Sequence, residues 1–69
     1  MAYNKLNFYK RVAEIQDIVL EEQTHGATLM WIYRNRIKRR FHISKSTFNN
    51  YLSIPAKAEL KKIENQTQN

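Results

Sequence analysis

The sequence predicts an all-α fold, a compact three- to four-helix bundle that contains a helix-turn-helix. The chain has 69 residues, which is enough for one domain. It has only one Gly and one Pro, which disfavours a turn-rich β fold. Apolar residues recur at helical spacing in several segments. We expect a single domain over residues 1–64 and a frayed polar tail over residues 65–69.

The first predicted helix runs from about Asn4, as its N-cap, to His25, with Gly26 as the residue that ends it. Spacings of four, three and four place one set of apolar residues on a single face: Phe8, Val12, Ile15 and Val19. A second apolar strip lies beside it, formed by Tyr9, Ala13 and Leu20. One partner helix does not usually cover this much apolar surface. Either the domain wraps the helix on two sides or a second chain covers part of it.

The second predicted helix starts after Thr28 as N-cap and runs to about Arg40. Its expected buried face consists of Met30, Tyr33, Ile37 and Phe41. For Trp31, packing against the first or fourth helix is favoured about two to one, because large aromatics dominate small cores. The alternatives are that it stacks on a base or covers the surface of a partner.

The third predicted helix begins after Ser44, whose side chain can cap it. Ile43 before the cap and Phe48 after it can form a hydrophobic staple. Phe48, Tyr51 and Leu52 are expected to face inward. Ile54 precedes Pro55 and should not be helical, whereas Pro55 suits the first turn of a fourth helix. That helix has a thin apolar face made of Ala56, Leu60 and Ile63.

The positive charge is concentrated in the middle of the chain. Residues 26–53 contain six basic residues and no acidic one, whereas residues 1–25 contain three basic and four acidic residues. A polyanionic partner is the simplest explanation of such a block of one sign, and a basic surface that only confers solubility is the less favoured alternative.

The stretch from Phe41 to Leu52 resembles the turn and recognition helix of bacterial and phage helix-turn-helix proteins. The apolar positions of that pattern are filled by Ile37, Phe41, Ile43, Phe48 and Tyr51, and Thr47 matches its frequent threonine. His42 stands near a usual Gly, and Lys38 stands where a small residue is usual. The chain as a whole resembles small helix-turn-helix proteins of Bacteroides-like bacteria and their phages. The motif would span about Thr28 to Ser53.

The resemblance implies that the third helix enters the major groove of double-stranded DNA. The residues expected to reach base edges are Lys45, Ser46, Asn49 and Asn50. Those expected to contact the DNA backbone are Arg34, Arg36, Arg39, Arg40 and Ser44. We therefore expect a small transcriptional regulator or a phage or mobile-element accessory factor, acting as a homodimer. The alternatives are an RNA-binding module and a protein-interaction component of phage assembly or packaging.

The sequence offers no machinery for catalysis, so we expect no enzyme, no cofactor and no small-molecule substrate. It has no cysteine, and the two isolated histidines, His25 and His42, make a metal site improbable. The first ten residues contain no apolar run of a signal peptide, and no segment is long enough to span a bilayer. We expect a cytoplasmic, nucleoid-associated protein without a membrane partner.

Overall fold

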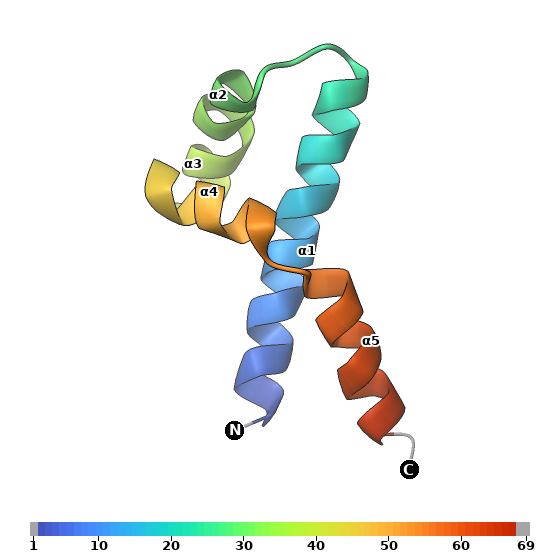
Figure 1. Cartoon of the computed structure of the whole chain (residues 1–69). Coiled ribbons are helices and arrows are strands. Elements are labelled where there is room, and N and C mark those ends of the chain that lie inside the picture. The colour runs from blue at the N-terminus through green and yellow to red at the C-terminus, as the bar shows by residue number, and fades with distance from the viewer. Residues whose placement is uncertain (1, 68–69) are drawn as a thin grey trace.

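The computed structural model describes residues 2–67, and every regular element within them is helical (Figure 1). In chain order the elements are α1 (Ala2–Thr24), α2 (Leu29–Ile32), the π-helix η1 (Tyr33–Ile37), α3 (Lys38–Phe41), α4 (Lys45–Ser53) and α5 (Ala56–Thr67). Because α2, η1 and α3 follow one another without a break, they form one continuous helix, called the central helix below. The prediction of a small all-α bundle is confirmed. Of the predicted tail, residues 65–67 belong to α5, and residues 68–69 lie outside the described part.

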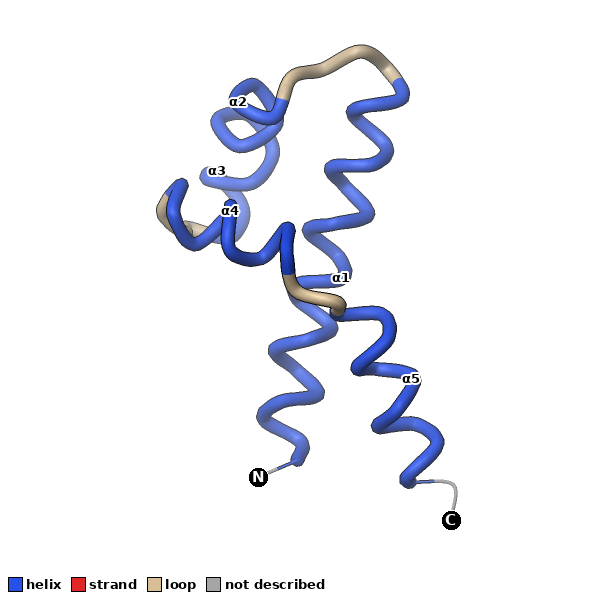
Figure 2. Tube along the Cα trace, viewed as in Figure 1, coloured by secondary structure: helices blue, strands red, loops and turns tan. Residues whose placement is uncertain are grey.

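Helix α1 is the scaffold against which the other helices pack (Figure 2). Its C-terminal half contacts α2 and α4, and α5 runs beside its N-terminal half. The helix already includes Asn4, so the prediction that Asn4 caps it is wrong. No Gly or Pro interrupts residues 2–4, and asparagine is tolerated inside a helix at a modest energetic cost.

Gly26 ends α1 as predicted, with a left-handed backbone at φ 86°. The N–H of Ala27 donates to the carbonyl of Glu22 at 3.1 Å, and the N–H of Gly26 donates to that of Gln23 at 3.0 Å. This pair of bonds is the Schellman arrangement, which satisfies the last carbonyls of a helix. The chain thereby reverses direction and reaches Thr28, whose Oγ1 accepts from the N–H of Trp31 at 3.2 Å and caps α2.

The apolar core has two parts, which follow one another along α1. The larger part joins α1 to the central helix and α4 through Ile15, Ile18, Val19, Ile32, Tyr33, Ile37 and Phe48. The smaller part joins α1 to α5 through Val12, Ala13 and Ala56, with Tyr9 and Leu60 packed against them. The second apolar strip is therefore covered by the domain itself where Tyr9 and Ala13 lie, chiefly by α5. Leu20 continues the second strip but stays 57% exposed.

The π turn of η1 changes which residues of the central helix are buried. The N–H of Lys38 donates to the carbonyl of Tyr33, five residues earlier, and this wider turn rotates the first turn of the helix relative to the last. Ile32, Tyr33 and Ile37 are consequently buried, whereas Met30 is 39% exposed. The prediction that Met30 shares the buried face is wrong, since it assumed an uninterrupted period of 3.6 residues.

One side chain of α1, that of Gln16, holds the corner between α4 and α5 through two hydrogen bonds. Gln16 Nε2 donates to the carbonyl of Tyr51 at 2.9 Å and to that of Ile54 at 2.6 Å. Ile54 is extended, as expected for a residue before proline. Pro55 lies immediately before α5 rather than inside its first turn, and its carbonyl accepts the N–H of Glu59 at 3.0 Å. Among the described residues, no helix is both long and apolar enough to cross a membrane.

Candidate nucleic-acid interface

The central helix and α4 are joined by a turn over residues 42–44. His42 adopts a left-handed backbone at φ 55°, which ends α3 and redirects the chain. Ser44 Oγ accepts the N–H of Thr47 at 3.2 Å, which confirms Ser44 as the N-cap of α4. Tyr33 Oη donates to the carbonyl of Ile43 at 2.9 Å and anchors the turn to the central helix. Local capping and one long-range hydrogen bond thus fix where α4 begins.

The left-handed residue of this turn leads to a stability prediction. The left-handed conformation is disfavoured by about 1–2 kcal/mol for an L-residue such as histidine, but not for glycine. Glycine in turn loses more conformational entropy on folding, which costs about 0.5–1 kcal/mol. We expect His42→Gly to raise the free energy of unfolding by about 0.5–1 kcal/mol, measured by urea denaturation. The opposite change at the other left-handed position, Gly26→Ala, should lower it by a similar amount. A decrease in stability in His42→Gly would contradict this account of the turn.

Helix α4 exposes the four residues that the sequence assigns to base contacts. Lys45, Ser46, Asn49 and Asn50 are all exposed. The opposite side of the helix is held by Phe48, which is fully buried, while Thr47, Tyr51 and Leu52 are half-buried. Ile43 packs against the same core cluster as Phe48, in agreement with the predicted staple. The exposed side of α4 therefore combines one cation with three short hydrogen-bonding side chains on a helix whose orientation is fixed.

Two of the predicted backbone-contacting arginines are engaged within the molecule. Arg36 Nη1 forms an ion pair with Glu22 of α1, and Arg40 Nη2 lies 2.5 Å from a carboxylate oxygen of Glu14, also on α1. The Arg40 guanidinium also lies 5.2 Å from the centroid of the Phe41 ring. Both side chains are thus directed toward α1, so their charges are partly neutralised where they lie. The sequence holds no local signal for these pairs, because the partners are far apart along the chain.

Other cations of the central helix remain exposed without a carboxylate partner in the described part of the chain. Arg34, Lys38 and Arg39 are exposed and make no ion pair there. Arg34 and Lys38 are four residues apart and share one side of the helix. Lys45 of α4 lies near the start of the same helix, since its Nζ is 3.6 Å from the sulfur of Met30, one turn before Arg34. The group Arg34, Lys38, Arg39 and Lys45 is called the basic patch below.

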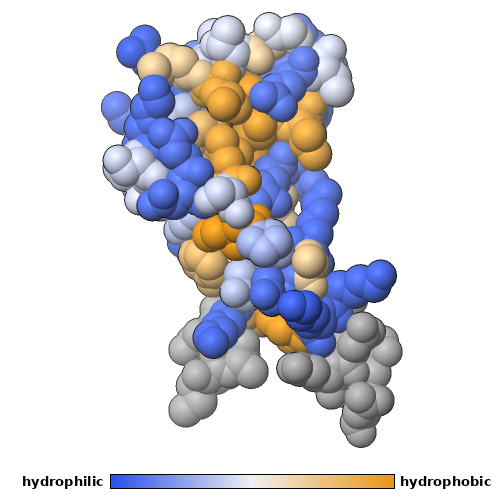
Figure 3. Space-filling view, viewed as in Figure 1, coloured by the Kyte–Doolittle hydropathy of each residue, from blue (hydrophilic) through white to orange (hydrophobic). Residues whose placement is uncertain are grey.

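Lys38 was missed as a site residue by the sequence reasoning, which considered only its fit between helices. The signal that could have found it is its spacing of four from Arg34. Ser44, which the sequence assigns to the DNA backbone, is exposed, and its hydroxyl caps α4 and donates to Thr47 Oγ1 at 3.0 Å. In Figure 3, hydrophilic side chains line the flank where the central helix and α4 lie, others lie on the opposite flank, and apolar side chains are visible between them.

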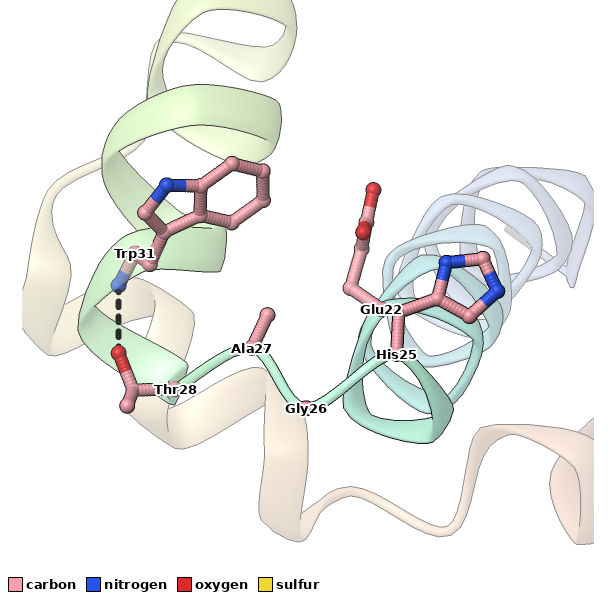
Figure 4. A pocket seen from close by; sticks show the side chains of 6 residues that line it. All are labelled: Glu22, His25, Gly26, Ala27, Thr28 and Trp31. Atoms are coloured by element: carbon pink, nitrogen blue, oxygen red, sulfur yellow. Dashed lines mark hydrogen bonds between the residues drawn. The ribbon is translucent and has the colours of Figure 1, made fainter.

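Trp31 lies outside the apolar core and is 46% exposed. It lines a shallow pocket of about 420 Å³ between α1 and α2, together with Glu22, His25, Gly26, Ala27 and Thr28. Figure 4 shows the indole on one side of this pocket and Glu22 with His25 on the other. Asn35, one turn further along, donates through Nδ2 to the carbonyl of Trp31 at 2.9 Å. The expected packing of Trp31 against the first or fourth helix is met only in part, since the indole lines this pocket beside α1 but belongs to neither core cluster.

The described residues contain no group of three or more His, Cys, Asp or Glu side chains placed to hold a metal ion.

The candidate site consists of the exposed polar side of α4, the basic patch and the exposed indole of Trp31. Comparison with known proteins finds no matching family model, no matching curated protein and no matching solved structure.

Proposed function

We propose that this protein binds double-stranded DNA, with α4 inserted into the major groove and the central helix placed above the phosphates. The observation that carries the proposal is the pairing of two surfaces. The exposed side of α4 has base-reading side chain types, and the basic patch beside it has no acidic neighbour in sequence between residues 26 and 53. Asparagine can bond bidentately to adenine, and lysine can donate to guanine.

Within this proposal the two groups of residues act differently. Lys45, Ser46, Asn49 and Asn50 select the sequence, while Arg34, Lys38 and Arg39 contribute affinity through phosphates. Arg36 and Arg40 should contribute less to phosphate binding, because each would first have to break its ion pair with a carboxylate of α1. Exposed ion pairs contribute little to stability, about 0–1 kcal/mol, so phosphate could displace Glu14 from Arg40.

In the cell such a protein would be a small transcriptional regulator or an accessory factor of a phage or mobile element, located on the nucleoid. One unit of this size contacts a short site, so we further propose that it acts as a homodimer on two half-sites. Selection of bound duplexes from a random pool tests the proposal directly, because an enriched motif is expected. Absence of duplex binding at low salt, measured by fluorescence anisotropy, would overturn it.

A second candidate, RNA binding, is favoured by one observation. The exposed indole of Trp31 offers a stacking surface on the same helix as the exposed Arg34, and splayed bases of single-stranded RNA stack on such rings. Competition between duplex DNA and single-stranded RNA for a labelled duplex separates the two functions. Preferential displacement by RNA, together with a large decrease of RNA affinity in Trp31→Ala, would favour the second.

The asparagines of α4 give a prediction about sequence selectivity. Asn49→Ala and Asn50→Ala should each weaken binding to the selected duplex by about 1–3 kcal/mol, the discrimination that one bidentate bond to a base supplies. Binding to a scrambled duplex should hardly change, because the phosphate-binding cations remain. Asn35→Ala is the matched control, since Asn35 is an exposed asparagine outside α4. Equal decreases on both duplexes, measured by anisotropy titration, would show that these side chains do not read bases.

A further inference from the structure

The uncovered end of the second apolar strip on α1 lies beside a groove. Leu20 is 57% exposed, although the strip below it is covered by α5. Together with Gln16 and Val19 it forms one wall of a groove of about 390 Å³, whose other wall is Leu52, Ser53, Ile54 and Pro55 from the α4–α5 corner. The walls are mainly apolar, and a projecting leucine stands next to a hollow on the same face. This set of residues is called the Leu20 groove below.

We propose that the Leu20 groove is the contact between two copies of this chain, related by a two-fold axis. A two-fold contact uses the same patch on both partners, so it needs a projection and a hollow side by side. The Leu20 groove provides both. Leu20 of each copy would enter the groove of the other and contact Leu52 and Ile54.

The distribution of charge favours a second copy as the occupant. The chain carries a net charge of +6, so two copies repel each other wherever their basic patches approach. Around Leu20, however, the nearest charged residues on α1 are the acidic Asp17 and Glu21, and Lys57 of α5 lies 2.6 Å from Asp17. This mixed rim is self-complementary, because Asp17 of one copy can meet Lys57 of the other. An acidic polymer has no reason to bind here.

The proposed contact would also arrange the two copies of α4. Leu52 and Ser53 are the last residues of α4, so the two helices would approach the axis by their C-terminal ends. The halves with Lys45 and Asn49 would then point away from the axis. This last step rests on the proposed DNA binding, and it predicts that the selected sites are palindromic.

Leu20→Glu is the variant that tests the contact. Sedimentation equilibrium without nucleic acid, from about 1 µM to about 1 mM, should show a monomer–dimer equilibrium for the natural chain. Leu20→Glu should raise the dimer dissociation constant at least about tenfold. Leu29→Glu is the matched control, because Leu29 is 40% exposed but lies outside the groove, and it should dimerise normally. Circular dichroism should show that both variants keep their helices.

A second measurement does not depend on an added charge. The chain has no cysteine, so one substitution introduces a unique thiol. Ser53→Cys, in the groove, should form a disulfide-linked dimer on mild oxidation, whereas Ser46→Cys, at the other end of α4, should not. The inference is overturned if the natural chain stays monomeric, if Leu20→Glu dimerises as well as the natural chain, or if both cysteines cross-link equally. Because these measurements omit DNA, their failure is distinguishable from a failure to bind DNA.

Discussion

Replacing Phe48 with alanine is expected to unfold most of the chain at physiological temperature. The ring is fully buried and lies in the larger core cluster, with its centroid 5.5 Å from that of Tyr33. Truncating a buried phenylalanine lowers the free energy of unfolding by about 3–5 kcal/mol. A domain of this length has about 3–10 kcal/mol in total, so little would remain. Disappearance of helical circular dichroism and of a cooperative thermal transition would report the effect.

Phe8→Ala is the matched control for this prediction. Phe8 is 37% exposed and contacts Tyr9 and Tyr51 edge-on, with centroids 5.4 Å and 5.5 Å away. Its removal should lower the free energy of unfolding by about 1 kcal/mol, and the chain should remain folded. Phe48→Leu, which keeps most of the buried volume, should fall between the two. If Phe48→Ala melted at the same temperature as Phe8→Ala, the position of the core would be wrong.

Removing two cations from the basic patch is expected to have the largest effect on the proposed DNA binding. In Arg34→Ala/Lys38→Ala, two phosphates are no longer neutralised by the protein, so fewer counterions are released on binding. The slope of the logarithm of affinity against the logarithm of salt concentration should become shallower by about 1.8, since each neutralised phosphate contributes about 0.9. At low salt the affinity for every duplex should fall by about ten- to a hundredfold, whatever its sequence.

The control for this variant removes the same charge elsewhere. Lys61 and Lys62 are exposed on α5, which runs away from α4 (Figure 1). Lys61→Ala/Lys62→Ala lowers the net charge equally but should leave the salt slope unchanged. If both double variants reduced the slope to the same extent, binding would depend on overall charge and not on the basic patch.

The parts of the fold that depend on neighbouring residues in the chain were predictable. Thr28 and Ser44 cap their helices, Gly26 ends α1, and Ile54 with Pro55 makes a corner, because each follows from the conformational preference of one or two residues. The exposed side of α4 was predictable for the same reason, since the staple from Ile43 to Phe48 defines the buried side.

The parts that depend on packing between distant segments were not predictable. The π turn accompanies the packing of Ile32, Tyr33 and Ile37 into one core, and nothing in the sequence between Thr28 and Phe41 indicates it. The ion pairs of Arg36 and Arg40 need α1 to lie beside the central helix. The number of basic residues in a segment therefore overestimates the positive surface available to a partner when acidic residues elsewhere in the chain pair with some of them.

The two hydrogen bonds from Gln16 decide how the position of α4 is specified. Apolar packing such as that of Phe48 is non-directional, and a helix held by it alone can roll or slide slightly on its scaffold while keeping most of its burial. The side-chain amide of Gln16, which donates to the carbonyls of Tyr51 and Ile54, restricts this movement. Hydrogen bonds are directional, so both bonds form only when α4 has one rotation about its axis and one position along α1. The end of α4 is thus held in one orientation and at one position on α1. This also fixes the direction in which the exposed side chains of α4 point.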